Sequence, residues 1–265
     1  MSEFPKPVAL VTGASAGIGA VYAERLAERG YDLILIARRL DRLKALANKL
    51  AAAHGTKVEI VEADLTVEAD LAHVEQVLRD TPTIQILVNN AGIATLAPVM
   101  ETSAQDAAAM IALNVTALTR LTHAILPEFL ARNEGAIINI ASVLSFHSLP
   151  ISAIYSGTKG YVMNFSRGLQ QELAGTNVRL QLVMPASTAT ELWDLSGVPL
   201  AALNKSSVMT AENLVDAGLV GFDKGESITL PSVHDADLWE QFDKARTALF
   251  AATQTGEPAP RYIAG

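Results

Sequence analysis

Cysteine is absent from the 265-residue chain. This absence excludes disulfide bonds, thiolate chemistry and cysteine-ligated metals, and we expect no metal site. Basic residues are outnumbered, because 20 Lys and Arg stand against 28 Asp and Glu and leave a net charge of −8. Such a chain lacks the positive surface that nucleic acids and anionic membranes bind. We therefore expect neither a nucleic acid nor a membrane as a partner.

Long uninterrupted apolar runs are also missing. No stretch of about 18 residues is free of polar side chains, so the sequence predicts no membrane-spanning segment. The first residues, MSEFPKPVAL, lack a basic region followed by a long apolar core, so no secretory signal peptide is expected. Half of the residues are apolar and 18% are charged, which is typical of a folded chain with a sizeable core. We expect a cytoplasmic protein.

Short β-branched runs alternate with longer amphipathic stretches along the sequence. Near-continuous apolar runs are typical of parallel strands that are covered on both faces. The alternation predicts a doubly wound, Rossmann-like α/β sheet of seven parallel strands with helices on both faces. No repeat or linker divides the chain, so residues 1–265 are expected to form a single domain. Strands are predicted at 7–13, 32–37, 57–64, 84–90, 135–142, 178–185 and 227–233, and helices at 17–29, 39–54, 67–80, 105–132, 153–174 and 211–224.

Two segments fall outside this alternation. Residues 186–209 follow a strand end and carry Trp193, Leu195, Val198 and Leu200 without a clear period. Ligands of open α/β sheets bind at the carboxyl ends of the strands, so this segment is interpreted as a substrate lid, with a plain surface connection as the alternative. Residues 235–265 are expected to form a C-terminal helix, at 235–252, followed by a tail.

The stretch AIYSGTKGY, residues 153–161, places Tyr155 four residues before Lys159. On a helix these two side chains share a face. A neighbouring ammonium favours the phenolate and brings the tyrosine pKa toward the working range of a proton donor. Taken alone, the pair is equally compatible with a packed tyrosine beside a solvated lysine.

A glycine-rich turn, TGASAGIG at residues 12–19, joins the first predicted strand to the first helix. Glycines permit a tight turn and close approach to a pyrophosphate, and the helix N-terminus supplies N–H donors. Glycines also make ordinary turns, but the strand–turn–helix context favours nucleotide binding.

Taken together, these motifs resemble those of the short-chain dehydrogenase/reductase family, in the branch of about 250 residues. The turn TGASAGIG is similar to the TGxxxGxG form of that branch, ADL at 63–65 to its adenine-contacting stretch, and NNAG at 89–92 to its fourth-strand signature. The resemblance covers residues 7–233. The residues in the positions of the catalytic group are Asn114, Ser142, Tyr155 and Lys159.

The resemblance implies a hydride transfer between a nicotinamide and a carbonyl or alcohol carbon. Ser142 would hold the substrate oxygen, and Tyr155 would give it a proton or take one from it. Lys159 would lower the pKa of Tyr155 and hold the nicotinamide ribose, while Asn114 would anchor a water that relays protons. The expected activity is that of an NADP-dependent carbonyl reductase or alcohol dehydrogenase on a small molecule. The alternatives are an NAD-preferring alcohol dehydrogenase and a redox-sensing cofactor-binding protein with little catalysis.

The cofactor is expected to be NADP. After the second strand, LIARRL offers Arg38 and Arg39 where NAD enzymes of the family usually carry an acid, and arginines there can bind a 2′-phosphate. Arg38, nearer the strand end, is the better candidate. The cofactor-binding residues implied by the resemblance are Gly13, Ser15, Ala16, Gly17, Ile18, Gly19, Arg38, Arg39, Asp64, Leu65, Asn90, Ala91, Gly92, Tyr155, Lys159, Pro185, Thr188 and Thr190.

Three further expectations come from this comparison. In PASTAT, residues 185–190, Ala186 stands where the family usually has glycine, and we expect the loop to adjust to the added Cβ. His147 is either a substrate contact or a loop residue satisfied locally. The fourth and fifth predicted helices are apolar around much of their circumference, which favours a homo-oligomer, with a dimer preferred over a tetramer.

Overall fold

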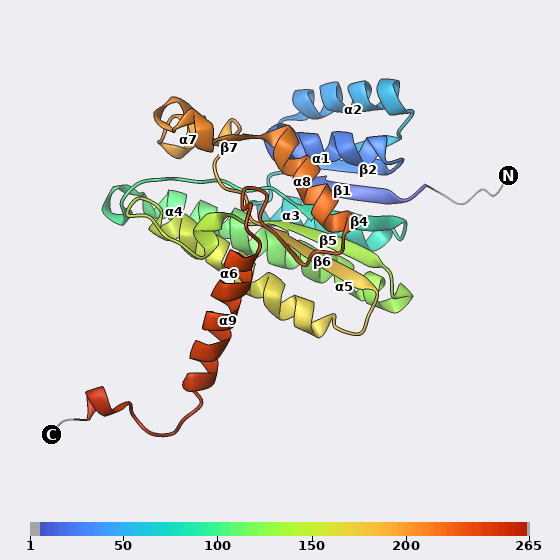
Figure 1. The fold of residues 1–265 in the computed structure, drawn as a ribbon. Coiled ribbons are helices and arrows are strands. Elements are labelled where there is room, and N and C mark those ends of the chain that lie inside the picture. The colour runs from blue at the N-terminus through green and yellow to red at the C-terminus, as the bar shows by residue number, and fades with distance from the viewer. Residues whose placement is uncertain (1–5, 264–265) are drawn as a thin grey trace. The chain divides into compact units, whose positions relative to one another are not determined.

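The computed structural model describes residues 6–263, which form two compact units that divide between Pro231 and Ser232. The first unit contains a parallel sheet with helices on both faces (Figure 1). The second contains the helix α9 (Asp237–Ala252) and a single 3₁₀ turn at Pro260–Tyr262.

The main sheet has seven strands in the order β3-β2-β1-β4-β5-β6-β9, and neighbouring strands pair in parallel throughout. The predicted doubly wound fold is confirmed. The last strand is shorter than expected, since it spans two residues rather than 227–233, and Pro231 lacks the N–H that a longer ladder needs. The strands are β1 (Val8–Thr12), β2 (Asp32–Ala37), β3 (Val58–Glu62), β4 (Ile84–Asn89), β5 (Gly135–Ile140), β6 (Val178–Val183) and β9 (Ile228–Thr229).

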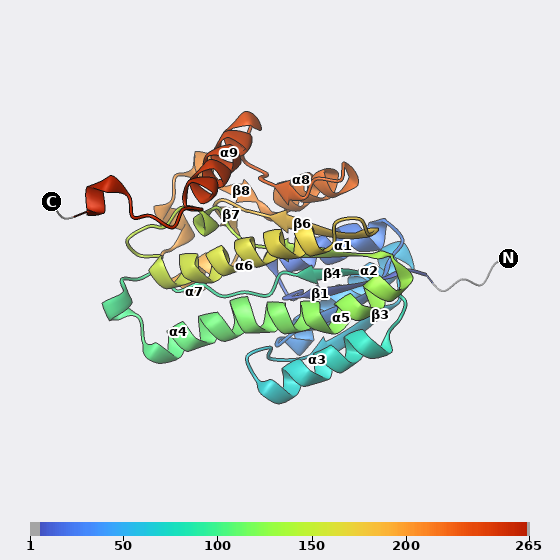
Figure 2. The same ribbon diagram turned by 90° about the horizontal axis from the view of Figure 1, so that it is seen from below.

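Two hydrophobic cores lie on the two faces of the sheet, because alternate side chains of a strand point to opposite sides. In β1, Ala9 and Val11 belong to the core beneath α1 (Gly17–Glu28), α2 (Leu40–His54) and α8 (Ala211–Asp223). Leu10 points to the other core, beneath α3 (Glu68–Asp80), α5 (Leu118–Arg132) and α6 (Ala153–Glu172). Figure 2 shows α3, α5 and α6 side by side across that second face.

The helix predicted at 105–132 is interrupted in its first half. An α-helix, α4 (Ala104–Ile111), passes into a π-helical segment, Ala112–Ala117, before α5 begins. Single π-helical turns inside α-helices occur frequently at functional sites. The helical stretch Ala104–Arg132 is long and apolar enough by composition to cross a membrane, and 44% of its most apolar window is buried inside the fold.

The segment 186–209 is built from short elements. It contains β7 (Thr188–Ala189), α7 (Leu192–Ser196) and the first residue of β8 (Met209–Thr210), and β7 and β8 pair in parallel as a separate two-stranded sheet. Trp193 Nε1 donates to the Thr188 carbonyl (2.8 Å), and Leu96 N donates to the Ser196 carbonyl (2.7 Å). The first bond lies within the segment, and the second ties the segment to the chain that follows β4.

Candidate active site

A cavity of about 720 Å³ opens at the carboxyl edge of the sheet, and its volume is in the range of small-molecule sites. Of the predicted catalytic and cofactor-binding residues, all but Gly19 and Asn114 line it. Those that line it are Gly13, Ser15, Ala16, Gly17, Ile18, Arg38, Arg39, Asp64, Leu65, Asn90, Ala91, Gly92, Ser142, Tyr155, Lys159, Pro185, Thr188 and Thr190.

The glycine-rich turn forms one end of the cavity. Gly17 has φ +55°, and α1 begins there behind Ala16, which provides no side-chain cap. The first turn of α1 contains no acidic residue. Gly19 lies behind the turn, where an added Cβ would come within 2.4 Å of the Gly13 carbonyl oxygen. This uncapped helix N-terminus on a turn without bulky side chains suits an anionic group such as a pyrophosphate.

Asn90 ties the turn to the neighbouring strand. Its Nδ2 donates to the Thr12 carbonyl (2.9 Å), and its backbone N–H donates to Thr12 Oγ1 (3.0 Å). Thr12 Oγ1 in turn donates to the Val88 carbonyl (3.2 Å). The three bonds fix the ends of β1 and β4 to each other. They therefore set the distance between the glycine turn and the chain that follows β4.

Asn114 is buried within the π-helical segment, and its amide bonds to backbone and side-chain groups around it. Oδ1 accepts from Ile93 N (2.9 Å), and Nδ2 donates to the Ile93 carbonyl (2.9 Å) and to Thr158 Oγ1 (3.0 Å). Thr158 lies in α6, three residues after Tyr155, and donates to its carbonyl (2.8 Å). Asn114 thus connects the chain after β4 to the helix that carries Tyr155 and Lys159. The water relay stays a prediction.

Ser142 and Tyr155 meet at the middle of the cavity wall. Ser142 follows β5 in extended conformation, its Oγ accepts from Leu144 N (3.1 Å), and it lines the cavity together with Tyr155. Burial raises the pKa of Tyr155 to about 12, and the interaction with the Ser142 side chain offsets part of this rise. Tyr155 packs in a small apolar cluster with Ala94 and Met110. This tyrosine is therefore protonated and ready to act as a donor.

Lys159 is buried one helical turn further along α6. Its Nζ donates to the Ile140 carbonyl (2.9 Å) and lies 5.9 Å from the centre of the Tyr155 ring. Burial lowers the pKa of Lys159 to about 8, because the ammonium loses its hydration. The expected depression of the Tyr155 pKa by Lys159 is not seen in this structure. Desolvation dominates both groups, and the lysine is directed toward a backbone carbonyl.

The two arginines after β2 take different partners. Arg38 is exposed, and its Nη1 lies 3.6 Å from Asp64 Oδ2. Arg39 donates from Nε and Nη2 to Ser15 Oγ (3.1 and 3.0 Å) and from Nη1 to Glu191 Oε2 (2.7 Å). Sequence reasoning missed Glu191, because a carboxylate far along the chain gives no local signal of this pairing.

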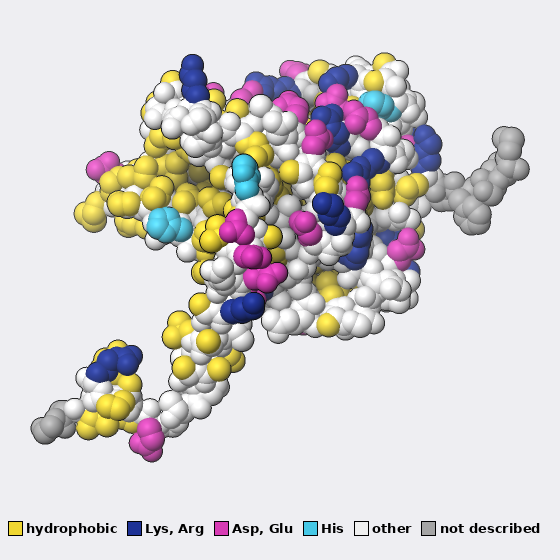
Figure 3. Space-filling view, viewed as in Figure 1, with side chains coloured by type: hydrophobic (Ala, Val, Ile, Leu, Met, Phe, Trp, Pro, Cys, Tyr) yellow, Lys and Arg dark blue, Asp and Glu magenta, His cyan; other side chains and the backbone are white. Residues whose placement is uncertain are grey.

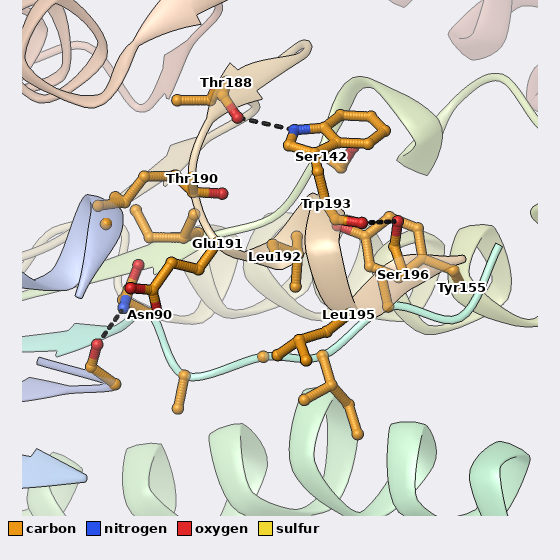
Figure 4. Close-up of a pocket in the computed structure, with 18 of the residues that line it drawn as sticks. Asn90, Ser142, Tyr155, Thr188, Thr190, Glu191, Leu192, Trp193, Leu195 and Ser196 are labelled. Carbon is orange, nitrogen blue, oxygen red and sulfur yellow. Dashed lines mark hydrogen bonds between the residues drawn. The ribbon is translucent and has the colours of Figure 1, made fainter. Parts of the chain in front are cut away.

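The other end of the cavity is apolar. Figure 4 shows Leu192, Trp193 and Leu195 on the side that holds Tyr155, with Asn90 and Glu191 on the other side. Leu96, Leu144, Leu149, Ile151, Val198 and Leu203 complete this part of the lining, whereas the Leu200 singled out in the sequence does not line it. His147 is exposed and also lies outside the lining. The sequence predicted that residues 186–209 line the substrate end, but nothing in residues 144–151 indicated that this loop also lines it.

Ala186 is accommodated without backbone strain. Among residues 6–263, Asn133 is the one non-glycine residue with a positive φ, so Ala186 has ordinary backbone geometry. Its carbonyl accepts a hydrogen bond from Thr188 Oγ1 (3.1 Å). The loop thus takes a conformation that a residue with a Cβ can adopt.

Comparison with known proteins identifies the family. A sequence model described as short chain dehydrogenase matches residues 7–197. Serine 3-dehydrogenase from Agrobacterium fabrum is 38% identical over 184 residues, which cover 69% of this chain and 72% of that protein. The 17-beta-hydroxysteroid dehydrogenase type 3 of Homo sapiens is 34% identical over 186 residues, and the match spans 69% of this chain and 60% of the human protein. This chain belongs to the short-chain dehydrogenase family and is an oxidoreductase of that family.

Two solved structures resemble it over nearly the full length. A short-chain dehydrogenase from Sphingobium yanoikuyae, in complex with NADPH, has a TM-score of 0.94 and 45% identity, covering 97% of this chain and 100% of that one. A bulky-bulky ketone specific alcohol dehydrogenase from Comamonas testosteroni has a TM-score of 0.90 and 38% identity, with 98% and 100% covered.

The buried Lys159 predicts a stability difference that depends on pH. Its pKa in the native state is about 8, below the ordinary 10.5, so between these pH values the unfolded chain holds a proton that the native chain lacks. Stability therefore rises with pH through this window, and the full cost, on the order of 3 kcal/mol, applies below pH 8.

We expect the free energy of unfolding of the parent, relative to Lys159→Met, to rise between pH 8 and 10.5. Urea unfolding of both proteins at several pH values measures the difference, and the comparison cancels the titration of groups that do not interact with Lys159. A difference that is flat with pH would show that Lys159 titrates normally.

Proposed function

We propose that this protein is an NADPH-dependent ketoreductase or alcohol dehydrogenase that acts on an uncharged, largely apolar carbonyl compound. The observation that carries the proposal is the placement of Ser142, Tyr155 and buried Lys159 in one cavity wall, at the junction between an anion-binding turn and an apolar end of that cavity. We further propose that residues 186–209 act as a substrate lid and that the protein is cytoplasmic.

A bound nicotinamide supplies the hydride for reduction of a carbonyl, or accepts it in the reverse direction. Ser142 donates a hydrogen bond to the substrate oxygen and fixes its position beside Tyr155. Tyr155, with its raised pKa, holds its proton at neutral pH and delivers it to that oxygen. Lys159 then compensates the charge left on the phenolate and holds the ribose of the dinucleotide. Apolar side chains around Tyr155 exclude water from the transfer.

The preference for NADPH rests on charge at the adenosine end of the cavity. Arg38 and Arg39 line that end, and they occupy the two positions between Ala37 and Leu40, so no acid follows the strand directly. A guanidinium binds a phosphate through charge-assisted hydrogen bonds, whereas a carboxylate there would repel it. The similar Sphingobium yanoikuyae enzyme was solved with NADPH, which supports the assignment.

The substrate class rests on the lining at the other end. Leu144, Leu149, Leu192 and Leu195 lie around the Ser142–Tyr155 pair, and the charged lining residues other than Lys159 belong to the adenosine end. Exposed hydrophobic side chains continue over the outside of this region, which lies at the α7 end in Figure 3. Burial of apolar groups thus provides the binding energy, and the similar bulky-bulky ketone enzyme is consistent with a large apolar substrate.

The Tyr155→Phe variant tests the proposed chemistry. Removing a general acid typically lowers the rate by about 10²–10⁴-fold, so we expect kcat to fall by this factor while NADPH still binds. Turnover is measured as loss of NADPH absorbance with a panel of apolar ketones, and binding by NADPH fluorescence. Tyr161→Phe is the matched control, because Tyr161 lies on the same helix and bonds to Thr119 outside the cavity. Near-normal turnover of Tyr155→Phe would refute the mechanism.

The ratio of kcat/KM for NADPH and NADH tests the cofactor assignment. Hydrogen bonds to charged groups contribute roughly 1.5–3 kcal/mol each, and partial screening leaves a preference for NADPH of about 10- to 100-fold. We expect Arg38→Ala to lose most of this preference. Arg29→Ala is the control, since Arg29 pairs with Asp223 away from the cavity. A parent enzyme that favours NADH would overturn the assignment, and an unchanged ratio in Arg38→Ala would move the role to Arg39.

We also propose a homodimer that pairs α5 and α6 with their counterparts in a second copy. Tyr161 stacks on Phe165 at 5.8 Å on the surface of α6, and Ile111 and Leu130 are exposed on the neighbouring helices. Light scattering at micromolar concentration should give twice the 28.1 kDa mass of the chain. Tyr161→Glu places a charge in this face and should shift the mass toward the monomer, whereas Tyr161→Phe should not. A monomeric parent would contradict the dimer.

A further inference from the structure

Glu191 joins the 186–209 segment to the arginines at the adenosine end of the cavity. Its Oε2 accepts from Arg39 Nη1 (2.7 Å), and both oxygens accept from Arg42 Nη1 (2.6 and 2.8 Å). The two guanidinium groups hold the pKa of Glu191 below its usual range, so the carboxylate is charged at neutral pH. One carboxylate therefore engages two cations at once.

This ion-pair cluster lies across the glycine-rich turn. Arg39 also donates twice to Ser15 Oγ, and a Cβ at Gly17 would meet the Thr190 methyl at 3.1 Å. Ser15, Gly17, Arg39, Thr190 and Glu191 all line the cavity. In Figure 4 the Glu191 side chain runs toward the side of the cavity that holds Asn90, away from Tyr155. The carboxylate is thus at the end of the cavity where an adenosine with its phosphates binds, under the function proposed above.

A carboxylate and a phosphate compete for a guanidinium, because both are anions that accept parallel N–H donors. They also repel each other at short range. We propose that Glu191 is an internal competitor for the 2′-phosphate of NADP(H). Its carboxylate occupies Arg39 and Arg42, and a phosphate bound at Arg38 gains a second guanidinium by displacing the carboxylate from Arg39. Glu191 thereby sets how strongly the site discriminates between dinucleotides with and without a 2′-phosphate.

The Glu191–Arg39–Arg42 cluster is not needed for the stability of the fold. Arg39, Arg42 and Glu191 are each roughly half exposed, and ion pairs between exposed groups contribute little to stability. The segment 186–209 has another attachment, from Leu96 N to the Ser196 carbonyl, and an internal bond from Trp193 to Thr188. Removal of the Glu191 charge should therefore leave the fold intact and change mainly the charge around Arg39 and Arg42.

The test uses two ligands that differ only in the 2′-phosphate, adenosine 2′,5′-bisphosphate and adenosine 5′-monophosphate. Neither contains a nicotinamide, so binding is measured by calorimetry without turnover. The discrimination ratio is the Kd of the monophosphate divided by the Kd of the bisphosphate. We expect Glu191→Gln, which keeps the shape and removes the charge, to raise this ratio about 3- to 10-fold at low ionic strength, with a smaller rise at high salt. Asp223→Asn removes a similarly exposed, arginine-paired acid away from the cavity and should leave the ratio unchanged.

A discrimination ratio that rises in Glu191→Gln and not in Asp223→Asn supports competition between Glu191 and the phosphate. An unchanged or lower ratio overturns it, and so does an equal change in the affinity for both ligands, which is what a general distortion of the segment would cause. This inference rests on the proposed use of NADPH, but the two can fail separately. A parent that prefers the bisphosphate keeps the proposed cofactor even if Glu191→Gln has no effect.

Discussion

Every strand of the main sheet runs in the same direction, and the position of every residue in the cavity depends on this constraint. The carboxyl ends of parallel strands meet at one edge, so the glycine turn after β1, the wall after β4 and Ser142 after β5 are neighbours in space although they lie far apart in the sequence. Hydrogen bonds from Asn90 to Thr12 and from Asn114 to Ile93 fix the loops that leave this edge. The loops at this edge are therefore held both by the strand ends and by the helical segment that carries Asn114.

A buried cation is the most costly feature of this site. Lys159 Nζ donates a hydrogen bond to a backbone carbonyl, and burial has removed most of the hydration of its ammonium group. A folded protein tolerates such a group at the expense of stability. Tyr155 carries the complementary cost, since its anionic form is the one that burial disfavours. The same apolar surroundings disfavour the charged form of each group, so a change of charge on one alters the energy of the other.

The fold and most of the cavity lining could be predicted from the sequence, because apolar runs and glycine-rich turns are local signals. Features that depend on contacts across the fold could not. The last strand ends early before Pro231, and the helix is π-helical around Asn114, whose side chain bonds to Ile93 and Thr158. The effect of Lys159 on Tyr155 was expected from spacing alone, whereas desolvation decides the direction of the tyrosine pKa. Glu191 meets Arg39 only after the sheet has brought residues 152 positions apart together.

The π-helical segment at Ala112–Ala117 has a geometric effect on the helices at its two ends. A π-helical turn contains one residue more than an α-helical turn, and one extra residue changes the rotational phase of a helix by about 100°. The apolar side of α4 accordingly brings Met110 against Tyr155, while the apolar side of α5 brings Leu121 and Ile125 against the sheet. The extra residue therefore lets one helical run pack against the sheet along part of its length and support Tyr155, in the cavity wall, along the rest.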